Sequence, residues 1–251
     1  MSSDEFKHHQ LQSKAAINQS AIANNYNEIG GTYYNLKKNE KALKSYKEAL
    51  KLYSTLSASD PVNRSNIAST LVNIAEVYHD LSEDDKSLEF YEQALYIYKE
   101  ISPENQTDIA EIIMNIAEIY NNLKKNEHAL KSYKNALKIY KESLPHNHSN
   151  ISNVLNKIAS VYSGIGENNS ALKNHKDALS VLKKAQPLNY FEIASTFNQI
   201  GIIYRNLSEN KKAMKNFYDG LALFIEKHPD SHLEIGTTLS NIGLIYDQLG
   251  K

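Results

Sequence analysis

The 251-residue sequence contains no cysteine, which excludes disulfides, thiolate metal sites and cysteine nucleophiles. Its 28 Lys and Arg residues balance 29 Asp and Glu residues. The chain therefore lacks the excess of positive charge that would predict a nucleic-acid partner. The first residues, MSSDEFKHHQLQSK, lack the apolar stretch of a secretory signal. No run of about 18 apolar residues predicts a membrane span. These absences favour a soluble cytoplasmic protein with no nucleic-acid or membrane partner.

Proline is scarce, and its placement is regular. The five prolines are Pro61, Pro103, Pro145, Pro187 and Pro229, each 42 residues after the one before. A fixed period of roughly 20 to 50 residues is typical of solenoids and propellers, in which one supersecondary unit is copied and stacked.

The copies are visible in the sequence itself. Residues 73–103 read NIAEVYHDLSEDDKSLEFYEQALYIYKEISP, and residues 115–145 read NIAEIYNNLKKNEHALKSYKNALKIYKESLP. Each copy begins with a large apolar residue, then Ile three later, a small residue, and Tyr three after that. This spacing places all four on one face of a helix. The Ile residues of this pattern are Ile29, Ile74, Ile116, Ile158, Ile200 and Ile242.

A second helix follows in each copy, with a ring between two small residues. The instances are Ala42/Tyr46/Ala49, Ser87/Tyr91/Ala94, Ala129/Tyr133/Ala136, Ala171/His175/Ala178 and Ala213/Phe217/Gly220. Small residues allow two helices to approach closely, and the ring fills the space between them. Polar segments such as KKNEK and SEDDK predict short turns between the helices, and the proline loop follows the second helix. The predicted unit is helix–turn–helix–loop, and the fold class is all-α.

This pattern resembles the tetratricopeptide repeat, and its 42-residue length resembles the kinesin light chain subtype, as does the segment SLPHNHSNISNVLNKIASVY. The resemblance implies a right-handed α-solenoid, a superhelix whose first helices line a concave groove that binds a peptide. We expect an N-terminal extension at 1–22, helical or disordered, and a repeat domain at 23–251. Its repeats are expected near 23–61, 68–103, 110–145, 152–187 and 194–229, with a half repeat at 236–251.

Asparagine recurs just before the Ile of each first helix, or one residue earlier. By resemblance, these residues are expected to contact a peptide backbone, since an amide side chain both donates and accepts hydrogen bonds. They are Asn27, Asn73, Asn115, Asn156, Asn198 and Asn241. The alternative is that asparagine, abundant in this chain, is simply tolerated on a polar inner face.

Charge along the expected groove is uneven. Glu76, Glu111 and Glu118 make the second and third repeats acidic, whereas Lys157 and Arg205 lie further along. We therefore expect a peptide with a basic end to suit the first half and an acidic peptide to suit the second, with charge setting orientation and association rate more than affinity. Lys157 and Arg205 complete the expected peptide-binding set.

Residues of catalytic or metal-binding type lack a supporting pattern. His146 and His148 flank one loop position, but no third metal ligand is fixed nearby. His175 replaces a ring of the second helix and is expected in the core. No phosphate-binding glycine loop and no nucleophile elbow occurs. We expect no enzyme activity, no cofactor and no metal.

The last helix pattern has no second helix after it. We expect apolar surface to remain open there, so that the chain is either a fragment of a longer array or self-associates through its C-terminal half repeat. The sequence as a whole predicts a non-catalytic adaptor or scaffold for protein or peptide ligands, with a kinesin light chain-like cargo adaptor, binding kinesin heavy chain or cargo, as one form. The alternative is a regulatory or scaffold repeat region of a larger protein whose catalytic domain lies elsewhere.

Overall fold

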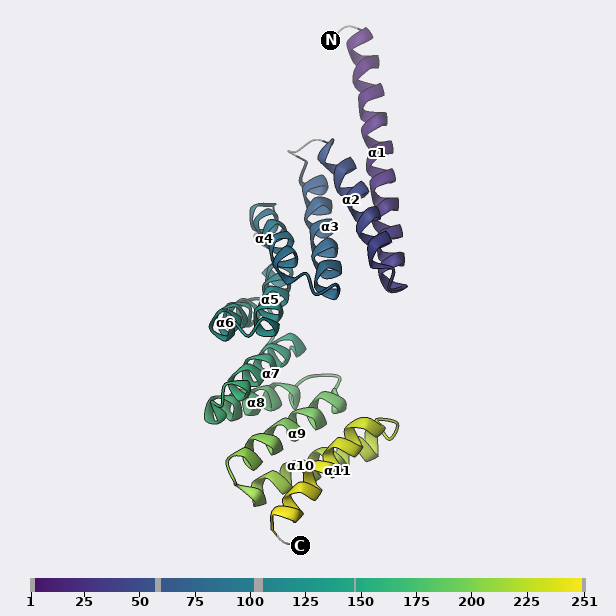
Figure 1. Cartoon of the computed structure of the whole chain (residues 1–251). Coiled ribbons are helices and arrows are strands. Elements are labelled where there is room, and N and C mark those ends of the chain that lie inside the picture. The colour runs from purple at the N-terminus through teal and green to yellow at the C-terminus, as the bar shows by residue number, and fades with distance from the viewer. Residues whose placement is uncertain (1–2, 57–59, 102–105, 147, 250–251) are drawn as a thin grey trace. The chain divides into compact units, whose positions relative to one another are not determined.

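The computed structural model describes residues 3–56, 60–101, 106–146 and 148–249, with the backbone alone for residues 3–17. The described residues form eleven α-helices and no strand (Figure 1), which confirms the all-α prediction. The helices are α1 (Ser3–Asn35), α2 (Asn39–Ser54), α3 (Pro61–Asp80), α4 (Asp84–Ile101), α5 (Gln106–Asn122), α6 (Asn126–Ser143), α7 (Ser149–Gly164), α8 (Asn168–Leu182), α9 (Tyr190–Asn206), α10 (Asn210–Lys227) and α11 (His232–Gln248). None of these helices is both long and apolar enough to cross a bilayer.

The chain divides into two compact units, Met1–Leu123 and Lys124–Lys251. In the first unit, each helix from α1 to α4 packs against the next one along the chain, and the same holds from α6 to α10 in the second unit. Odd-numbered helices are the first helices of the repeats and even-numbered helices are the second. First helices of adjacent repeats also touch, as α1 and α3 do in the first unit and α9 and α11 in the second.

The predicted ring of each second helix lies in the core. Those rings belong to Tyr46, Tyr91, Tyr133, His175 and Phe217, none more than 3% exposed. Glycine makes room for two of them. A Cβ at Gly30 would lie 2.6 Å from the ring of Tyr46, and one at Gly201 would lie 2.7 Å from the ring of Phe217. Burying such a ring contributes roughly 2 to 3 kcal/mol, so these two contacts stabilise the pairs α1–α2 and α9–α10.

The turns between paired helices share one backbone conformation. One residue in each has a positive φ near 60° to 80°, namely Lys37, Ser82, Lys124, Gly166 and Ser208. The left-handed residue reverses the direction of the chain while its N–H still donates to a carbonyl of the preceding helix. In the fifth repeat, the Ser208 N–H donates to the carbonyl of Arg205 over 2.9 Å. Glycine is the residue best suited to this conformation, and only one of these turns has it.

Proline begins a first helix in the first unit. Pro61 occupies the first turn of α3, and the carboxylate of Asp60 accepts the Val62 N–H over 3.0 Å. Proline is tolerated there because its missing N–H would have had no helical partner. The first helix of the chain, α1, runs without a break through residues 22 and 23.

Candidate functional site

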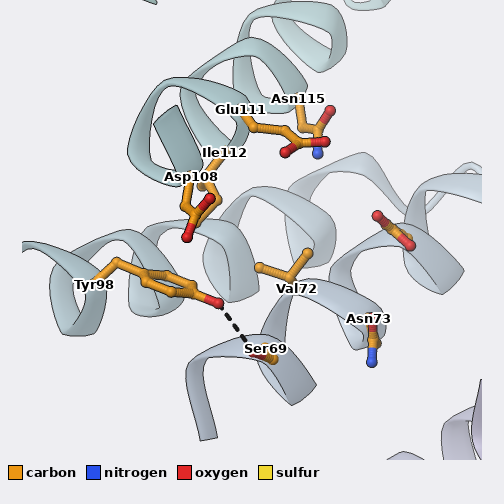
Figure 2. A pocket seen from close by; sticks show the side chains of 9 residues that line it. Ser69, Val72, Asn73, Tyr98, Asp108, Glu111, Ile112 and Asn115 are labelled. Atoms are coloured by element: carbon orange, nitrogen blue, oxygen red, sulfur yellow. Dashed lines mark hydrogen bonds between the residues drawn. The ribbon is translucent and has the colours of Figure 1, made fainter. Parts of the chain in front are cut away.

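A hollow of about 340 Å³ lies between α3 and α5 in the first unit (Figure 2). Its lining residues recur every three or four positions along each helix, because such residues share one helix face. Those residues are Ser69, Val72, Asn73 and Glu76 of α3, Tyr98 of α4, and Asp108, Glu111, Ile112 and Asn115 of α5. The hydroxyl of Tyr98 reaches across to within 2.9 Å of the Ser69 hydroxyl.

A second hollow, of about 230 Å³, continues the first and shares Glu76 and Asn115 with it. Its other lining residues are Tyr34 of α1, His79 and Asp80 of α3, Tyr91 of α4, and Glu118 and Ile119 of α5. We call the two hollows together the acidic groove. The groove is therefore built by first helices, with tyrosines of α1 and α4 at its sides.

Carboxylates dominate this lining. They belong to Glu76, Asp80, Asp108, Glu111 and Glu118. No Lys or Arg is among the lining residues. The one imidazole, of His79, lies 2.9 Å from the carboxylate of Asp84. Asp80 has a cationic neighbour in Lys37, at 3.3 Å, whose side chain is largely in solvent. Among the residues that line the groove, acidic side chains therefore outnumber basic ones.

Burial and the neighbouring carboxylates raise the pKa of groups inside the groove. Burial raises the pKa of Glu76, and the carboxylates of Glu111 and Asp80 raise it further. Burial, then Asp80 and Glu76, raises the pKa of Tyr34 to about 12. The pKa of Tyr91 is also raised, by burial first and then by Glu76. A cation placed between Glu76 and Glu111 would relieve the repulsion between these carboxylates.

Two of the expected asparagines, Asn73 of α3 and Asn115 of α5, line the same hollow of the acidic groove. The amide of Asn73 also donates to the Asn27 Oδ1 of α1 over 3.4 Å. These three side chains are half-buried. The first unit therefore brings its share of the expected set onto one continuous surface.

In the second unit, Asn156 is occupied by contacts within the protein. Its Nδ2 donates to the Thr196 hydroxyl of α9 over 3.1 Å, which turns its Oδ1 toward the ring of His175. That oxygen lies 2.8 Å from Nδ1 of His175, so Nδ1 carries the proton and donates. The ring is 1% exposed, and burial lowers its pKa to about 4. The expected core position of His175 is confirmed.

Asn198 makes the same contact with a threonine in the next repeat. Its Nδ2 donates to the Thr238 hydroxyl of α11 over 2.5 Å, and the side chain is only 9% exposed. Each threonine hydroxyl in turn donates a hydrogen bond to a backbone carbonyl of its own helix. Thr196 donates to the carbonyl of Glu192, and Thr238 donates to that of Glu234. These bonds connect the first helices α7, α9 and α11 into one series. An Asn followed 40 residues later by Thr is the sequence signal that could have found it.

The remaining members of the expected set are also in the second unit. A guanidinium nitrogen of Arg205 donates to Oδ1 of Asn241 over 2.6 Å, joining α9 to α11. Asn241 is 9% exposed, and Lys157 lies half-buried on α7. A peptide role for these residues stays a prediction, and the contacts of Asn156, Asn198 and Asn241 give each a structural role as well.

Several groove residues were not expected from the sequence. Ser69, Tyr98 and Asp108 line the acidic groove with Glu76 and Glu111. Asp108 could have been predicted from the sequence, because it precedes Glu111 by three residues and therefore shares its helix face. Tyr98 could not be found this way, since it comes from a second helix.

One loop histidine caps a helix. Nδ1 of His148 accepts the N–H of Asn150 over 3.2 Å and so caps α7. Within the residues that the structure describes, no group of three or more His, Cys, Asp or Glu could hold a metal ion.

Comparison with known proteins adds family information to this geometry. The tetratricopeptide repeat model matches residues 19–100 and 108–184. No curated protein matches the sequence.

Among solved structures, the chain is similar to BtubC (BKLC) from P. vanneervenii, with a TM-score of 0.73 and 23% identity over 86% of this chain and 85% of that one. It is also similar to a structure of nearly identical TPR-like repeats from a Podosopora anserina protein of the kinesin light chain type. That comparison gives a TM-score of 0.68 and 13% identity over 84% of this chain and 98% of that one. RapI, in its apo form, gives a TM-score of 0.64 and 17% identity over 92% of this chain and 85% of that one. At these identities the likeness shows the fold alone.

Proposed function

Because the chain belongs to the tetratricopeptide repeat family, whose domains generally bind proteins, we propose that it is a non-catalytic adaptor that holds a basic peptide segment of a partner protein in the acidic groove. The observation that carries this proposal is the pairing of two amides, Asn73 and Asn115, with five carboxylates on one hollowed surface. The amides suit the peptide backbone, and the carboxylates suit Lys or Arg side chains.

The peptide is expected to lie along the first helices, with a Lys or Arg between Glu76 and Glu111. Those two carboxylates belong to adjacent first helices and line the same hollow. A single cation can neutralise both, and a guanidinium can bond them with its planar set of N–H donors. The similarity to BtubC (BKLC) and the Podosopora anserina repeats supports a kinesin light chain-like adaptor as the finer form of this function.

The test is a binding titration with two labelled decapeptides of alternating residues, one with Arg and Ala and one with Glu and Ala. We expect the Arg peptide to bind the chain more tightly, and its affinity to fall as salt is added, because exposed charge pairs are screened. The double variant Glu76→Gln/Glu111→Gln should weaken binding about tenfold, and Asn73→Ala/Asn115→Ala should weaken it for both peptides.

A matched control removes the same charge elsewhere. Glu89 and Glu92 are exposed on α4 and do not line the groove, so Glu89→Gln/Glu92→Gln should leave the affinity within about twofold of the wild type. If Glu89→Gln/Glu92→Gln weakened binding as much as Glu76→Gln/Glu111→Gln, the net charge of the chain, and not the groove, would attract the peptide. Equal binding of the two peptides would contradict the proposed partner chemistry.

A further inference from the structure

The second unit contains a hollow of about 480 Å³, built by the end of α8 and the loop after it, the start of α9, and the second half of α10. Six of its eight lining side chains are apolar or aromatic. The lining residues are Lys183, Leu188, Tyr190, Ile193, Phe197, Asp219, Ala222 and Leu223. Ligand sites in proteins typically have volumes of roughly 300 to 1,000 Å³ and mostly apolar walls with a few polar groups. We call this space the apolar hollow.

An equivalent hollow, of about 340 Å³, occurs one repeat earlier. Its lining residues are His146, Ser180, Val181 and Lys184. The first three stand 42 positions before Leu188, Ala222 and Leu223 of the apolar hollow. The earlier hollow is open although a complete repeat, α9 and α10, comes after it. Such an opening is therefore a feature of the repeat itself, and a following repeat does not close it.

The hollow of the fifth repeat is the less polar of the two. Leu188 and Ala222 stand where the fourth repeat has the imidazole of His146 and the hydroxyl of Ser180. The third repeat has Lys138 at the position of Ala222, so a methyl group replaces a long side chain there. An apolar group that enters this hollow leaves water and covers the apolar walls, which is favourable.

Two groups of opposite charge complete the lining. The Nζ of Lys183 lies 4.8 Å from the centroid of the Phe197 ring, so this ammonium group is held at the wall of the hollow. The carboxylate of Asp219 comes from α10. Among the residues that the structure describes, neither group forms an ion pair. A ligand with an anionic group on one side of its apolar part and a cationic group on the other is complementary to both.

We propose that the apolar hollow docks a peptide segment of another protein in which a large apolar side chain stands between an acidic and a basic residue. The apolar side chain enters the hollow, its acidic neighbour pairs with Lys183, and its basic neighbour pairs with Asp219. Tryptophan suits the central position, since aromatic side chains in such pockets contribute much of the binding energy of protein interfaces. The hollow belongs to the second unit, and the proposal does not depend on the function proposed for the acidic groove.

The chain contains no tryptophan, which provides a direct readout of binding. The indole of a Trp peptide is then the only one in solution, and its emission shifts to shorter wavelength when it leaves water. We would titrate the full chain into Gly-Ser-Asp-Trp-Lys-Ser-Gly and into Gly-Ser-Lys-Trp-Asp-Ser-Gly, since the lining does not fix the direction of the peptide. One of the two should give a saturable shift, with half-saturation below about 1 mM.

The variant Ala222→Lys tests whether the peptide occupies the hollow. It introduces the residue that the third repeat has at this position, Lys138, so the fold should tolerate it while the long side chain weakens binding by about tenfold or more. Ile225→Lys is the matched control, because Ile225 is exposed on the same helix, does not line the hollow and stands 42 positions after Lys183. The control should bind within about twofold of the wild type.

The charge pattern is tested by changing both sides of each pair. Lys183→Gln should weaken binding about two- to fivefold, as expected for an exposed ion pair, and should not affect a peptide with Ser in place of its Asp. Asp219→Asn should depend in the same way on the Lys of the peptide. A variant that weakens both kinds of peptide equally would contradict the proposed pairing.

The proposal is wrong if neither peptide gives a saturable shift, or if Ala222→Lys binds as tightly as the wild type. It is also wrong if a peptide with Ser in place of both charged residues binds equally well, because any apolar group would then fit. A dimer of the chain alone that Ala222→Lys dissociates would identify a second copy as the occupant instead. Glu76→Gln/Glu111→Gln should leave the Trp peptides bound as before, so the two proposals succeed or fail separately.

Discussion

At the scale of single residues, the asparagines of the first helices differ in what they contact. Asn73 and Asn115 line an open groove, whereas Asn156 and Asn198 spend their donors on threonines of the next first helix. A side chain at 9% exposure, as in Asn198, offers little to a ligand. Asn73 and Asn115 come directly before the Ile of their repeats, whereas Asn156 and Asn198 come one residue earlier. The two pairs therefore lie about 100° apart around the helix and meet different neighbours.

His175 makes the stability of the fold depend on pH. Its folded pKa of about 4 lies below the ordinary value of 6.5, so between these pH values the unfolded chain binds a proton that the folded chain does not. Folding stability is therefore present in full above about pH 6.5 and falls as the pH drops toward 4, by about 3 kcal/mol.

Urea unfolding at several pH values measures this loss. Carboxylates contribute to the same curve, so the quantity compared is the difference between the wild type and His175→Phe, which has the ring found at Phe217 in the next repeat. The variant should lose less stability than the wild type between pH 6.5 and 4. Parallel curves would mean that His175 takes up its proton in the folded state as readily as in the unfolded one.

At the scale of the helix pair, the turn contains a residue in the left-handed conformation. Its left-handed residue is Gly166 in the fourth repeat, with φ +81°, and Ser208 in the fifth, with φ +58°. Serine in this conformation costs about 1 kcal/mol relative to glycine. The adjacent repeats are otherwise built alike, which makes their turns a natural pair for comparison.

Exchanging the two turn residues tests this cost. Ser208→Gly should raise the free energy of unfolding by up to about 1 kcal/mol, and Gly166→Ser should lower it by a similar amount. The double exchange should return close to the wild-type value, since the backbone hydrogen bonds of the two turns involve different residues. Thermal or urea unfolding of the three variants is sufficient. Two changes of the same sign would mean that side-chain contacts outweigh backbone strain at these turns.

At the scale of the whole molecule, the main contacts between described helices of one unit join a helix to the next one along the chain or to the next first helix. A repeat array of this kind behaves approximately as a chain of nearest-neighbour interactions. Damage at one interface should therefore open the helices next to it and leave distant helices protected.

Gly220→Ala provides such local damage. The new Cβ would lie 2.8 Å from Oδ1 of Asn198 and 2.9 Å from the carbonyl of Ala194, so α9 and α10 must shift apart at a cost of roughly 1 to 3 kcal/mol. Hydrogen exchange should become faster in α8 to α11 and stay unchanged in α1 to α4. Gly236→Ala is the control, because it meets no atom within 4 Å and should be neutral or slightly stabilising. Faster exchange throughout the chain would show that the array unfolds as one cooperative body.

The sequence by itself determined the helices, their pairing and the buried ring of each second helix, because these depend on residues a few positions apart and recur with a fixed period. Tyr46 and Phe217 could be placed in the core without coordinates for that reason. It also indicated the acidic character of the second and third repeats, since Glu76, Glu111 and Glu118 all fall on the predicted first helices.

Only the tertiary structure decided which polar residues remain available to a ligand. Asn198 and Thr238 meet across two first helices from different repeats, and Tyr98 enters the groove from a second helix. Neither contact follows from the spacing within one helix, because both depend on how neighbouring helices pack, and a repeated sequence does not record that.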